Sequence, residues 1–236
     1  MITLALDSTA KAASCAVLKD ERCLALYTID NGLTQSELLL PMAESALKSL
    51  GLNFCDIDLY AASVGPGSFT GVRIGVSLIK GLAFGSNTPC VQVSTLEALA
   101  ENLSPLEGFL LPCMDARRGQ VYTATFESDG KELKRLTEDR AISLNELADE
   151  LLELPPRRIY LSGDGLCVAR RALIERGVTL SETPPLLVTQ NAYSVGLVAL
   201  RKYARGEVVT DSEISPTYLR LPQAERERLE REMMQK

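Results

Sequence analysis

The sequence predicts an α/β fold made of two lobes, each a mixed sheet flanked by helices. Strand-like and helical segments alternate along the 236 residues, and the order strand, turn, helix occurs in both halves. A break at residues 104–108, which contains proline and glycine, separates the halves, and a new β-rich run begins after it. We therefore expect an N-terminal lobe over residues 1–104 and a C-terminal lobe over residues 105–236.

The composition is that of an ordinary globular protein, with 46% hydrophobic and 24% charged residues. The net charge of −6 and the scattered basic pairs argue against a nucleic-acid footprint, so we expect any RNA to be held by a partner. No apolar run is long enough to span a bilayer, and no basic flank precedes the apolar N-terminus. We therefore expect a cytoplasmic protein without a membrane partner.

The counts of cysteine and histidine narrow the possible chemistry. The six cysteines show no C-x-x-C spacing and are expected to be reduced and mostly buried. There is no histidine, which removes histidine-ligated metal sites, histidine general bases and Ser-His-Asp machinery. Any chemistry would therefore rest on carboxylates, hydroxyls, cationic side chains or backbone groups.

In the first half, short apolar segments alternate with helical patterns. Thr34 and Glu37 fit a capping box at the start of a helix, and Gly51 is a natural C-cap at its end. Pro41 lies within the helical pattern that follows, so this helix is either kinked there or begins near it. Ser68 can cap the next helix. The expected strands are 2–6, 15–18, 23–28, 58–64 and 89–93, and the later helices are 69–84 and 96–102.

The second half continues the alternation up to a charged tail. The tail from Ala224 onward is dense in Glu and Arg, which indicates a solvated helix to which we assign no function. The sequence leaves open where the last helix packs. The expected strands are 109–114, 119–127 and 157–161, and the expected helices are 144–154, one that ends near 176, and 192–205.

Two features of the first half have both a functional and a structural explanation. Asp7 precedes Ser8 and Thr9 at a strand end and could hold a magnesium-bound phosphate, but spacing alone favours a turn residue that caps its own backbone. The first helix carries a broad apolar stripe that could face a partner, but the pattern alone favours a core position. The stripe includes Leu38, Leu39, Met42 and Ala46.

The segment 64–75 joins a tight turn to the start of a helix. Gly65 and Gly67 flank a proline, and Gly71 and Gly75 leave one helix face without side chains, so another backbone can approach closely. A phosphate-binding P-loop would need a Gly-Lys-Ser/Thr, which is missing, and the spacing fits a dinucleotide fingerprint poorly. A G-x-S-x-G nucleophile elbow is also absent. What remains is a turn built for close packing, with an optional anion site at the helix N-terminus.

These residues, together with motifs elsewhere, resemble the bacterial TsaB family, also called YeaZ. The most specific match is the glycine segment 65–75, followed by Lys-Gly-Leu-Ala at 80–83. Further matches follow in the same order along nearly the whole chain. They are Asp-Ser-Thr at 7–9, Ser-Glu at 36–37 before Leu-Leu-Pro at 39–41, Val-Ser-Thr-Leu-Glu-Ala-Leu at 93–99, Asp-Ala-Arg-Arg-Gly-Gln-Val-Tyr at 115–122, Gly-Asp-Gly at 163–165 and Pro-Thr-Tyr-Leu-Arg at 216–220.

The resemblance implies an actin-like ATPase fold, of the sugar-kinase and Hsp70 type, with two related lobes. It also implies a non-catalytic scaffold that pairs with the catalytic paralogue TsaD and with the ATPase TsaE. That machinery places threonylcarbamoyl on N6 of adenosine 37 in tRNAs that read ANN codons. TsaB pairs with TsaD mainly through its first two helices, so the resemblance makes these helices the expected partner surface. In this chain the expected surface is Leu38, Leu39, Met42, Ala46, Gly71, Val72, Gly75 and Ile79.

The resemblance further implies a vestigial nucleotide cleft between the lobes. We expect no cofactor on the chain alone, ATP and magnesium only in complex with the partners, and tRNA only through that complex. We also expect a homodimer when the partner is absent, because an apolar partner surface tends to be covered by a second copy. Actin-like folds often return the last helix to the first lobe. The residues expected in the cleft are Asp7, Gly163, Asp164 and Gly165.

Comparison with the catalytic paralogue sharpens the expectation of a non-catalytic chain. In that paralogue two histidines four apart bind the metal, and the matching positions here are Thr95 and Leu99. Leucine cannot ligate a metal, so this chain could not assemble that site. Many family members also carry a histidine where this chain has Gln35, which leaves the role of that side chain open.

Two other functions remain as alternatives. A stand-alone small-molecule kinase of the same fold would use Asp7 and Asp164 around ATP and magnesium. Such kinases usually need phosphate loops in both lobes; the segment 7–11 lacks glycine, and no loop is evident in the second lobe. A peptidase, which is an older label of this superfamily, would have neither histidine ligands nor a visible nucleophile here. A direct ATP titration would separate the scaffold from the kinase.

Overall fold

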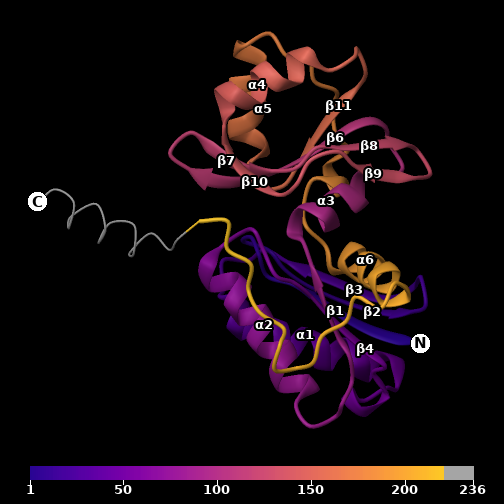
Figure 1. Cartoon of the computed structure of the whole chain (residues 1–236). Coiled ribbons are helices and arrows are strands. Elements are labelled where there is room, and N and C mark those ends of the chain that lie inside the picture. Colours follow the sequence, from indigo (N-terminus) through magenta and orange to yellow (C-terminus); the bar gives the residue numbers. More distant parts are fainter. Residues whose placement is uncertain (221–236) are drawn as a thin grey trace, which may run out of the picture.

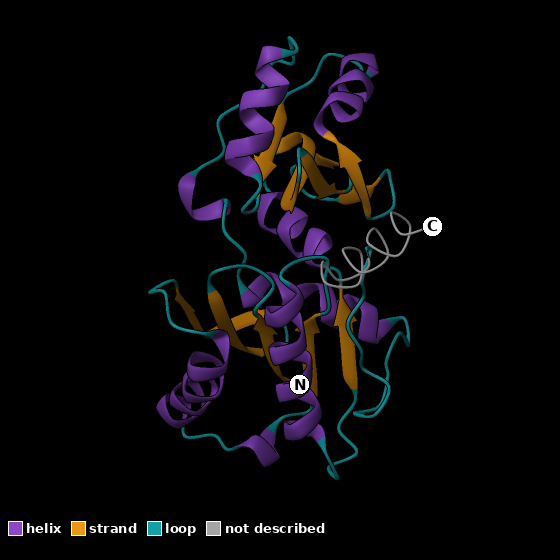
Figure 2. Ribbon diagram, turned by 90° about the vertical axis from the view of Figure 1, so that its left-hand side faces the viewer, coloured by secondary structure: helices purple, strands orange, loops and turns teal. Residues whose placement is uncertain are grey.

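The computed structural model describes residues 1–220, so the tail helix expected from Ala224 lies outside the described residues. The chain forms two lobes, which lie one above the other in Figure 1. The first lobe, at the bottom of that view, contains a five-stranded sheet, and the second lobe contains a six-stranded sheet. Figure 2 shows helices and sheets in both lobes from the side. No described helix is long and apolar enough to cross a membrane.

The sheet of the first lobe has the strand order β3-β2-β1-β4-β5. The first three strands form an antiparallel meander, and β4 and β5 continue the sheet as parallel strands on the other side of β1. This order and these directions are those of the actin-like ATPase fold, so the expected fold class is confirmed. The strands are β1 (Ile2–Asp7), β2 (Ala13–Lys19), β3 (Arg22–Ile29), β4 (Leu59–Ser63) and β5 (Cys90–Val93).

Helices cover both faces of this sheet because its strands are apolar on both sides. Along β1, Leu4 and Leu6 pack in one core with α1 (Gln35–Leu50) and α2 (Phe69–Ala83). Ala5 points to the other face, where it packs in a second core with α6 (Ala192–Ala204). The small side chains on that face let α6 lie close against the sheet.

The first helix begins and ends where the sequence indicates. The Thr34 N–H donates to Glu37 Oε2 over 2.9 Å, as a capping box requires. Gly51 ends the helix in the left-handed region at φ 67°, which glycine adopts without strain. The helix runs from Gln35 through Pro41, so the alternative in which it begins near the proline is wrong.

The second lobe repeats the plan of the first. β6 (Glu107–Arg117) is its central strand, and its neighbour is interrupted: Cys113 pairs with Thr123 in β7, and Leu110 pairs with Phe126 in β8. The sequence predicts one strand there, and the structure splits it. β9 and β10, which were not predicted, pair outside β8 and β7, and β11 runs parallel to β6. The remaining strands are β7 (Gln120–Thr123), β8 (Phe126–Asp129), β9 (Leu133–Arg135), β10 (Arg140–Ser143) and β11 (Ile159–Ser162).

The second sheet is also covered on both faces. The outer face carries α4 (Leu144–Glu153) and α5 (Leu166–Glu175), which pack on alternate residues of β6. The inner face carries α3 (Thr95–Leu103), so this helix lies between the two sheets (Figure 1). Two short 3-10 helices complete the described elements, η1 (Phe54–Asp56) and η2 (Pro185–Leu187).

The chain returns to the first lobe after about residue 190. α6 packs on the first sheet, and the segment after it, the C-terminal strap (residues 208–220), runs along the first lobe. Val209 pairs with Cys90 at the sheet edge, and the Thr217 N–H donates to the Val64 carbonyl over 2.7 Å. The expected C-terminal lobe over 105–236 is therefore too long. The second lobe spans about residues 107–190, and the last described helix belongs to the first lobe.

Candidate partner groove and interlobe cleft

The glycine segment packs against the turn that follows β1. A Cβ on Gly67 would lie 2.4 Å from the Thr9 carbonyl oxygen, and one on Gly71 would lie 2.0 Å from the Ser8 carbonyl oxygen. Ser68 caps α2 and donates its N–H to the Thr9 carbonyl over 2.7 Å. The predicted close approach is confirmed, but the backbone that approaches belongs to this chain rather than to a partner.

Most of the expected partner surface is core. On α1 the apolar stripe is wide because it packs at once against the sheet and against α2. Met42 is only 4% exposed, and Ile79 is fully buried. The expectation that these side chains face a partner is therefore wrong, and among them only Leu38 is partly exposed. The buried ones are Leu39, Met42, Ala46, Gly71, Val72, Gly75 and Ile79.

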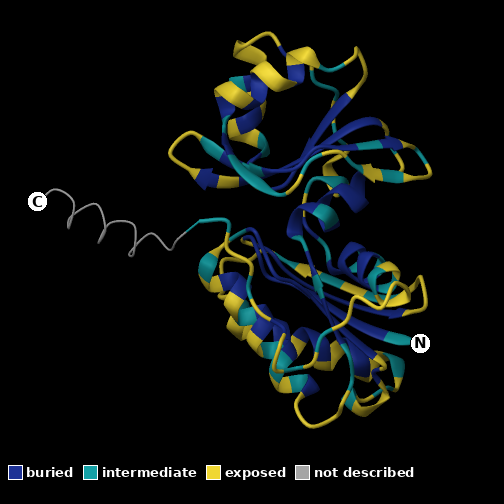
Figure 3. Cartoon of the chain, viewed as in Figure 1, coloured by how far each residue is buried: buried dark blue, intermediate teal, exposed yellow. Residues whose placement is uncertain are grey.

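A groove lies between the outer rows of the same two helices. It has a volume of about 530 Å³, and Leu40, at 37% exposure, stands on its α1 side. Figure 3 shows exposed and half-buried residues alternating with buried ones along α2. The groove and the partner surface expected from the sequence lie on the same two helices, but on different rows of them. The lining residues are Gln35, Ser36, Leu39, Leu40, Phe69, Thr70, Arg73, Ile74, Ser77 and Leu78.

An aromatic and cationic cluster stands at one end of this groove. The rings of Phe69 and Tyr218 stack with their centroids 4.7 Å apart. The guanidinium carbon of Arg73 lies 3.8 Å from the centre of the Phe69 ring, and its Nε donates to the Tyr218 hydroxyl over 2.8 Å. Tyr218 comes from the C-terminal strap, so the groove is not made by the two helices alone.

A second hollow, of about 650 Å³, lies between the lobes. Gln35, Phe69 and Thr70 line both this cleft and the groove, so the two hollows share a wall. The role left open for Gln35 is now clear: its Nε2 donates to the Ala10 carbonyl over 2.8 Å and ties the start of α1 to the turn after β1. Charged residues on the cleft wall are Lys11, Asp115, Arg117, Asp164 and Arg220.

Of the two acidic residues expected in the cleft, only Asp164 lines it. Its Oδ1 accepts the Asp115 N–H over 3.0 Å, and its pKa is raised because the cleft walls remove water from the carboxylate, although the residue as a whole is exposed. Asp7 is 1% exposed and has its oxygens occupied. They accept from the Ser63 hydroxyl over 2.6 Å and from the Thr9 N–H and hydroxyl over 2.9 and 2.8 Å.

These contacts decide between the two explanations of Asp7. Burial raises its pKa, and the three hydrogen bonds from Ser63 and Thr9 lower it, with burial the larger effect. A carboxylate that is buried and already caps the turn after β1 has no oxygen directed at a ligand. The explanation as a turn residue is confirmed.

The glycines expected in the cleft are packing residues. A Cβ on Gly163 would lie 2.4 Å from the Cys113 carbonyl oxygen, and one on Gly165 would lie 2.9 Å from it. The Gly165 N–H donates to the same carbonyl over 3.0 Å. Neither glycine lines the cleft. They let the turn after β11 close onto β6.

The positions that match the paralogue's metal ligands are buried in α3. Thr95 and Leu99 are fully buried, and Leu99 packs in the core between α3 and the second sheet. Among the described residues there is no group of three or more histidine, cysteine or acidic side chains that could hold a metal. All six cysteines are free, but Cys23, Cys55 and Cys167 are exposed, so the expectation that most are buried is wrong.

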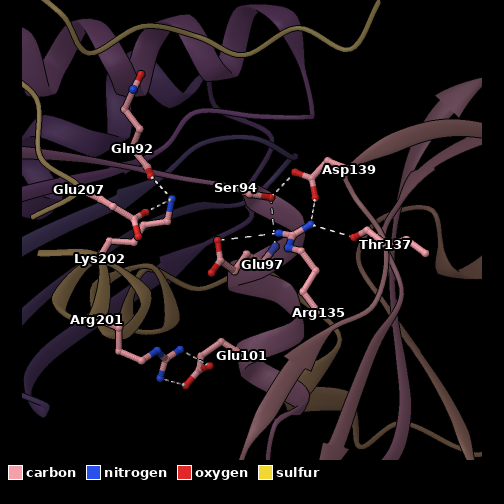
Figure 4. A network of polar contacts seen from close by, with 10 residues as sticks. All are labelled: Gln92, Ser94, Glu97, Glu101, Arg135, Thr137, Asp139, Arg201, Lys202 and Glu207. Carbon is pink, nitrogen blue, oxygen red and sulfur yellow. Dashed lines mark hydrogen bonds and ion pairs between the residues drawn. The ribbon is translucent and has the colours of Figure 1, made fainter. Parts of the chain in front are cut away.

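Polar contacts hold α3 to both lobes, as Figure 4 shows. At its start, the Ser94 hydroxyl bonds to Asp139 of the second lobe, and Arg135 Nη1 donates to Asp139 Oδ1 over 2.6 Å. Near its end, Glu101 forms an ion pair with Arg201 of α6. Sequence reasoning missed these contacts, because no local pattern links residues on separate elements.

Comparisons with known proteins agree on one family. A family model described as "TsaD: tRNA N6-adenosine threonylcarbamoyltransferase" matches residues 34–227. The tRNA threonylcarbamoyladenosine biosynthesis protein TsaB of Escherichia coli (strain K12) is 31% identical over 222 residues, which are 93% of this chain and 95% of that protein. The TsaB protein of Bacillus subtilis (strain 168) is 33% identical over 164 residues, which are 70% of this chain and 72% of that protein.

A solved structure supports the same assignment. YeaZ from Pseudomonas aeruginosa superposes with a TM-score of 0.76 at 26% identity, over 92% of this chain and 99% of that one. The match thus covers both lobes and the return of the chain. The turn on Asp7, the glycine segment and the two-lobed fold occur in a chain that matches the Escherichia coli TsaB protein along nearly the whole length of both. This chain belongs to the TsaB (YeaZ) family.

Proposed function

We propose that this chain is a non-catalytic subunit that pairs with a TsaD-like paralogue. With a TsaE-like ATPase, the pair would transfer threonylcarbamoyl to N6 of adenosine 37 in tRNAs that read ANN codons. The observation that carries this proposal is the apolar groove between α1 and α2, in a chain whose relatives are named for threonylcarbamoyladenosine biosynthesis. A groove between two helices is a common docking site for the helix of a partner.

Three observations support a non-catalytic role. The oxygens of Asp7 are occupied by the chain's own donors, so they are not directed at a nucleotide. Thr95 and Leu99 stand where the paralogue has its metal ligands, and the sequence has no histidine to replace them. The glycines of both strand-to-helix turns lie against backbone of this chain, so their lack of a side chain is accounted for by packing.

The remaining parts of the proposal concern the assembly. When the paralogue is absent, a second copy of this chain covers the groove and forms a homodimer. ATP and magnesium act only in the complex, and tRNA is held by the complex rather than by this chain, in keeping with its net charge of −6. The complex works in the cytoplasm, where tRNA is modified.

The test is co-expression with the TsaD-like protein of the same organism, followed by size-exclusion chromatography with light scattering. Leu40→Arg places a charge in the groove, and Leu152→Arg is its control, because Leu152 is an exposed leucine on the equivalent helix α4. We expect a one-to-one complex for the wild type and the control, and no complex for Leu40→Arg. A charge at Met42 would test folding instead, because that side chain is buried.

A wild-type chain that forms no complex, with or without nucleotide and the ATPase partner, would contradict the proposal. The alternative function is then a stand-alone small-molecule kinase, which the cleft and the raised pKa of Asp164 favour. Calorimetric titration of the isolated chain with ATP and magnesium decides this point. Binding of ATP to a chain that forms no complex supports the kinase, and a chain that binds neither ATP nor the paralogue contradicts both functions.

A further inference from the structure

We propose that Arg73 is the anchor of the groove and that it binds a carboxylate carried by an amphipathic helix of the partner. This inference rests on the proposed function, because it names the chemistry of the partner that docks between α1 and α2. The groove has two apolar walls, with Leu39 and Leu40 on α1 and Ile74 and Leu78 on α2. Such walls fit the apolar face of a helix.

The charge of the groove indicates which polar group the partner would present to it. Among residues 1–220, Arg73 is the one charged side chain that lines the groove, and no aspartate or glutamate of this part of the chain lines it. Among the described residues, no ion pair involves Arg73, and its hydrogen bond goes to the neutral hydroxyl of Tyr218 through Nε. The two terminal nitrogens of the guanidinium therefore keep donors for a ligand. A carboxylate fits these donors as a bidentate pair.

The guanidinium is held in place before any partner arrives. It lies 3.8 Å above Phe69 and its Nε bonds to Tyr218, so two contacts fix its plane and its direction. A side chain that is already ordered loses less conformational freedom when it forms the pair, which raises affinity without new contacts. Tyrosine and arginine are also the residue types that most often carry the energy of an interface.

The strap keeps Tyr218 in this position. The Thr217 N–H bonds to the Val64 carbonyl over 2.7 Å, and Ile214 is fully buried in the first core. The Thr217 carbonyl lies so close to Gly65 that a Cβ there would meet it at 2.5 Å. Further along, Arg220 donates to the Ala116 carbonyl of the second lobe over 3.0 Å. Tyr218 is thus part of a fixed segment rather than of a free chain end.

A phosphate of RNA would also satisfy the donors of Arg73. It would, however, leave the apolar walls of the groove exposed to water, and the described lining of the groove offers no second cation for a phosphate backbone. An amphipathic helix can pair its carboxylate with Arg73 and cover the apolar walls of the groove with its apolar face. The structure therefore favours a protein helix over RNA at this place.

The experiment measures the affinity of the chain for the TsaD-like protein at low and at high salt. Arg73→Ala removes the anchor, and Arg73→Lys keeps the charge but not the planar fork. Tyr218→Phe keeps the stacked ring and removes the acceptor of the Arg73 Nε–H. Arg171→Ala, on an exposed arginine of α5, is the matched control. Thermal unfolding of each variant checks that it is folded, and Arg73→Lys guards against a structural effect of the alanine.

We expect Arg73→Ala to weaken binding by about 30-fold or more, because loss of one partner of a desolvated ion pair leaves the other unpaired. Arg73→Lys should weaken binding about tenfold, because it loses the planar fork. Tyr218→Phe should weaken binding about threefold, because the guanidinium is oriented less well. The control should stay within about twofold of the wild type. Added salt should weaken the wild type more than Arg73→Ala, since the pair is partly screened.

Several results would overturn the inference. If the wild type binds and Arg73→Ala binds as tightly as the control, Arg73 is not the anchor, and the proposed function stands. If the wild type does not bind, the proposed function and this inference fall together. The carboxylate is tested by reversing the charge: Arg73→Glu should be rescued by a lysine at one acidic position of the partner. Failure at every acidic position, or a loss of tRNA retention with unchanged partner affinity, would overturn the carboxylate.

Discussion

The two lobes share one plan, yet their outer helical faces differ. In the second lobe, charged side chains of α4 and α5 form ion pairs, such as Arg176 with Asp149 and Arg171 with Glu175. In the first lobe, no ion pair among the described residues involves α1 or α2, and an apolar groove lies between them. The two lobes therefore differ in their outer faces: the second lobe has one that carries ion pairs, and the first lobe has one that carries an apolar groove. The difference lies in the exposed helix rows, because the buried rows fill a core in both lobes.

The strand-to-helix turns of the two lobes also differ in how tightly they close. In the first lobe, three glycines leave space for the turn after β1 to pack closely. A Cβ on Gly71 would lie 2.0 Å from a backbone oxygen of that turn. In the second lobe, a Cβ on Gly163 would lie 2.4 Å from a backbone oxygen, but one on Gly165, at the start of α5, would come no closer than 2.9 Å. The first lobe is thus the more tightly packed at the place where α2 begins. The predictions below test these differences in order of expected effect.

The largest effect is expected at Gly71. Gly71→Ala places a methyl group against the fixed backbone of Ser8, so the start of α2 must shift, and we expect the free energy of unfolding to fall by about 3 kcal/mol or more. Urea denaturation measures this loss. Gly81→Ala on the same helix is the control, because open space surrounds Gly81, and we expect it to stabilise the protein by about 0.5–1 kcal/mol.

Gly165→Ala extends the comparison to the second lobe. Its methyl group meets backbone atoms at 2.9 Å, which is less severe, so we expect a smaller loss than at Gly71. An equal or larger loss at Gly165 would mean that the two turns are equally tight, and the contrast between them would not hold.

The contacts of α3 with the second lobe should give the next effect. Arg135→Ala removes the donor to Asp139 and leaves a half-buried carboxylate beside Ser94, so we expect a loss of about 1–2 kcal/mol and faster hydrogen exchange at the start of α3. Arg171→Ala, which breaks an exposed pair on α5, is the control and should cost about 0.5 kcal/mol or less. Equal losses would show that the lobes are held by their apolar core alone.

The dependence of stability on pH should distinguish two carboxylates. Burial raises the pKa of Asp7 above its ordinary 3.8, so the folded protein holds this proton more tightly than the unfolded chain. This contribution to stability is complete below pH 3.8 and is lost as the pH rises through the raised pKa. Asp7→Asn should abolish this loss of stability with rising pH, which urea titrations at a series of pH values measure.

Asp129 in the second lobe should show the opposite sign. Backbone N–H groups of Glu132 and Lys131 lower its pKa, so its contribution is present above pH 3.8 and is lost as the pH falls through the lowered value. Asp129→Asn should therefore reduce the change of the free energy of unfolding with pH only at the acid end. If Asp7→Asn and Asp129→Asn both change the pH dependence in the same pH range, the raised pKa assigned to Asp7 is wrong.

The smallest effect is expected on the stability of the groove variants. Leu40→Arg and Leu152→Arg both replace an exposed leucine on the first helix of an outer pair, so each should change the free energy of unfolding by about 0.5 kcal/mol or less. Chemical denaturation of the monomer measures both. A large loss for Leu40→Arg alone would mean that the groove is part of the core of the first lobe.

Local signals along the chain were sufficient for much of the fold. The capping box at Thr34, the C-cap at Gly51 and the cap at Ser68 each depend on residues within one turn, and each occurs as predicted. β9 and β10 escaped prediction because they are short and carry charged residues, so they lack an apolar alternation.

The site was harder to predict, for a physical reason. Periodicity shows that one side of α1 is apolar, but not whether a sheet or a partner covers it, and so Met42 was assigned to the wrong surface. The Arg73 cluster depends on Tyr218, which is 145 residues away along the chain. No local pattern links two such residues, and only the return of the chain brings them together.

The return of the chain also sets an order of events on the ribosome. The second lobe is one continuous stretch of the chain. In the first lobe, by contrast, one face of the sheet stays uncovered until α6 is made, and the sheet edge at Cys90 stays unpaired until Val209 is made. We expect the second lobe to fold during synthesis while the first lobe stays incomplete until α6 and the strap have emerged. Because Tyr218 follows every described helix and strand along the chain, Arg73 is oriented only after residue 218 has emerged. A nascent copy that lacks this residue would present the groove without the stacked ring that orients Arg73.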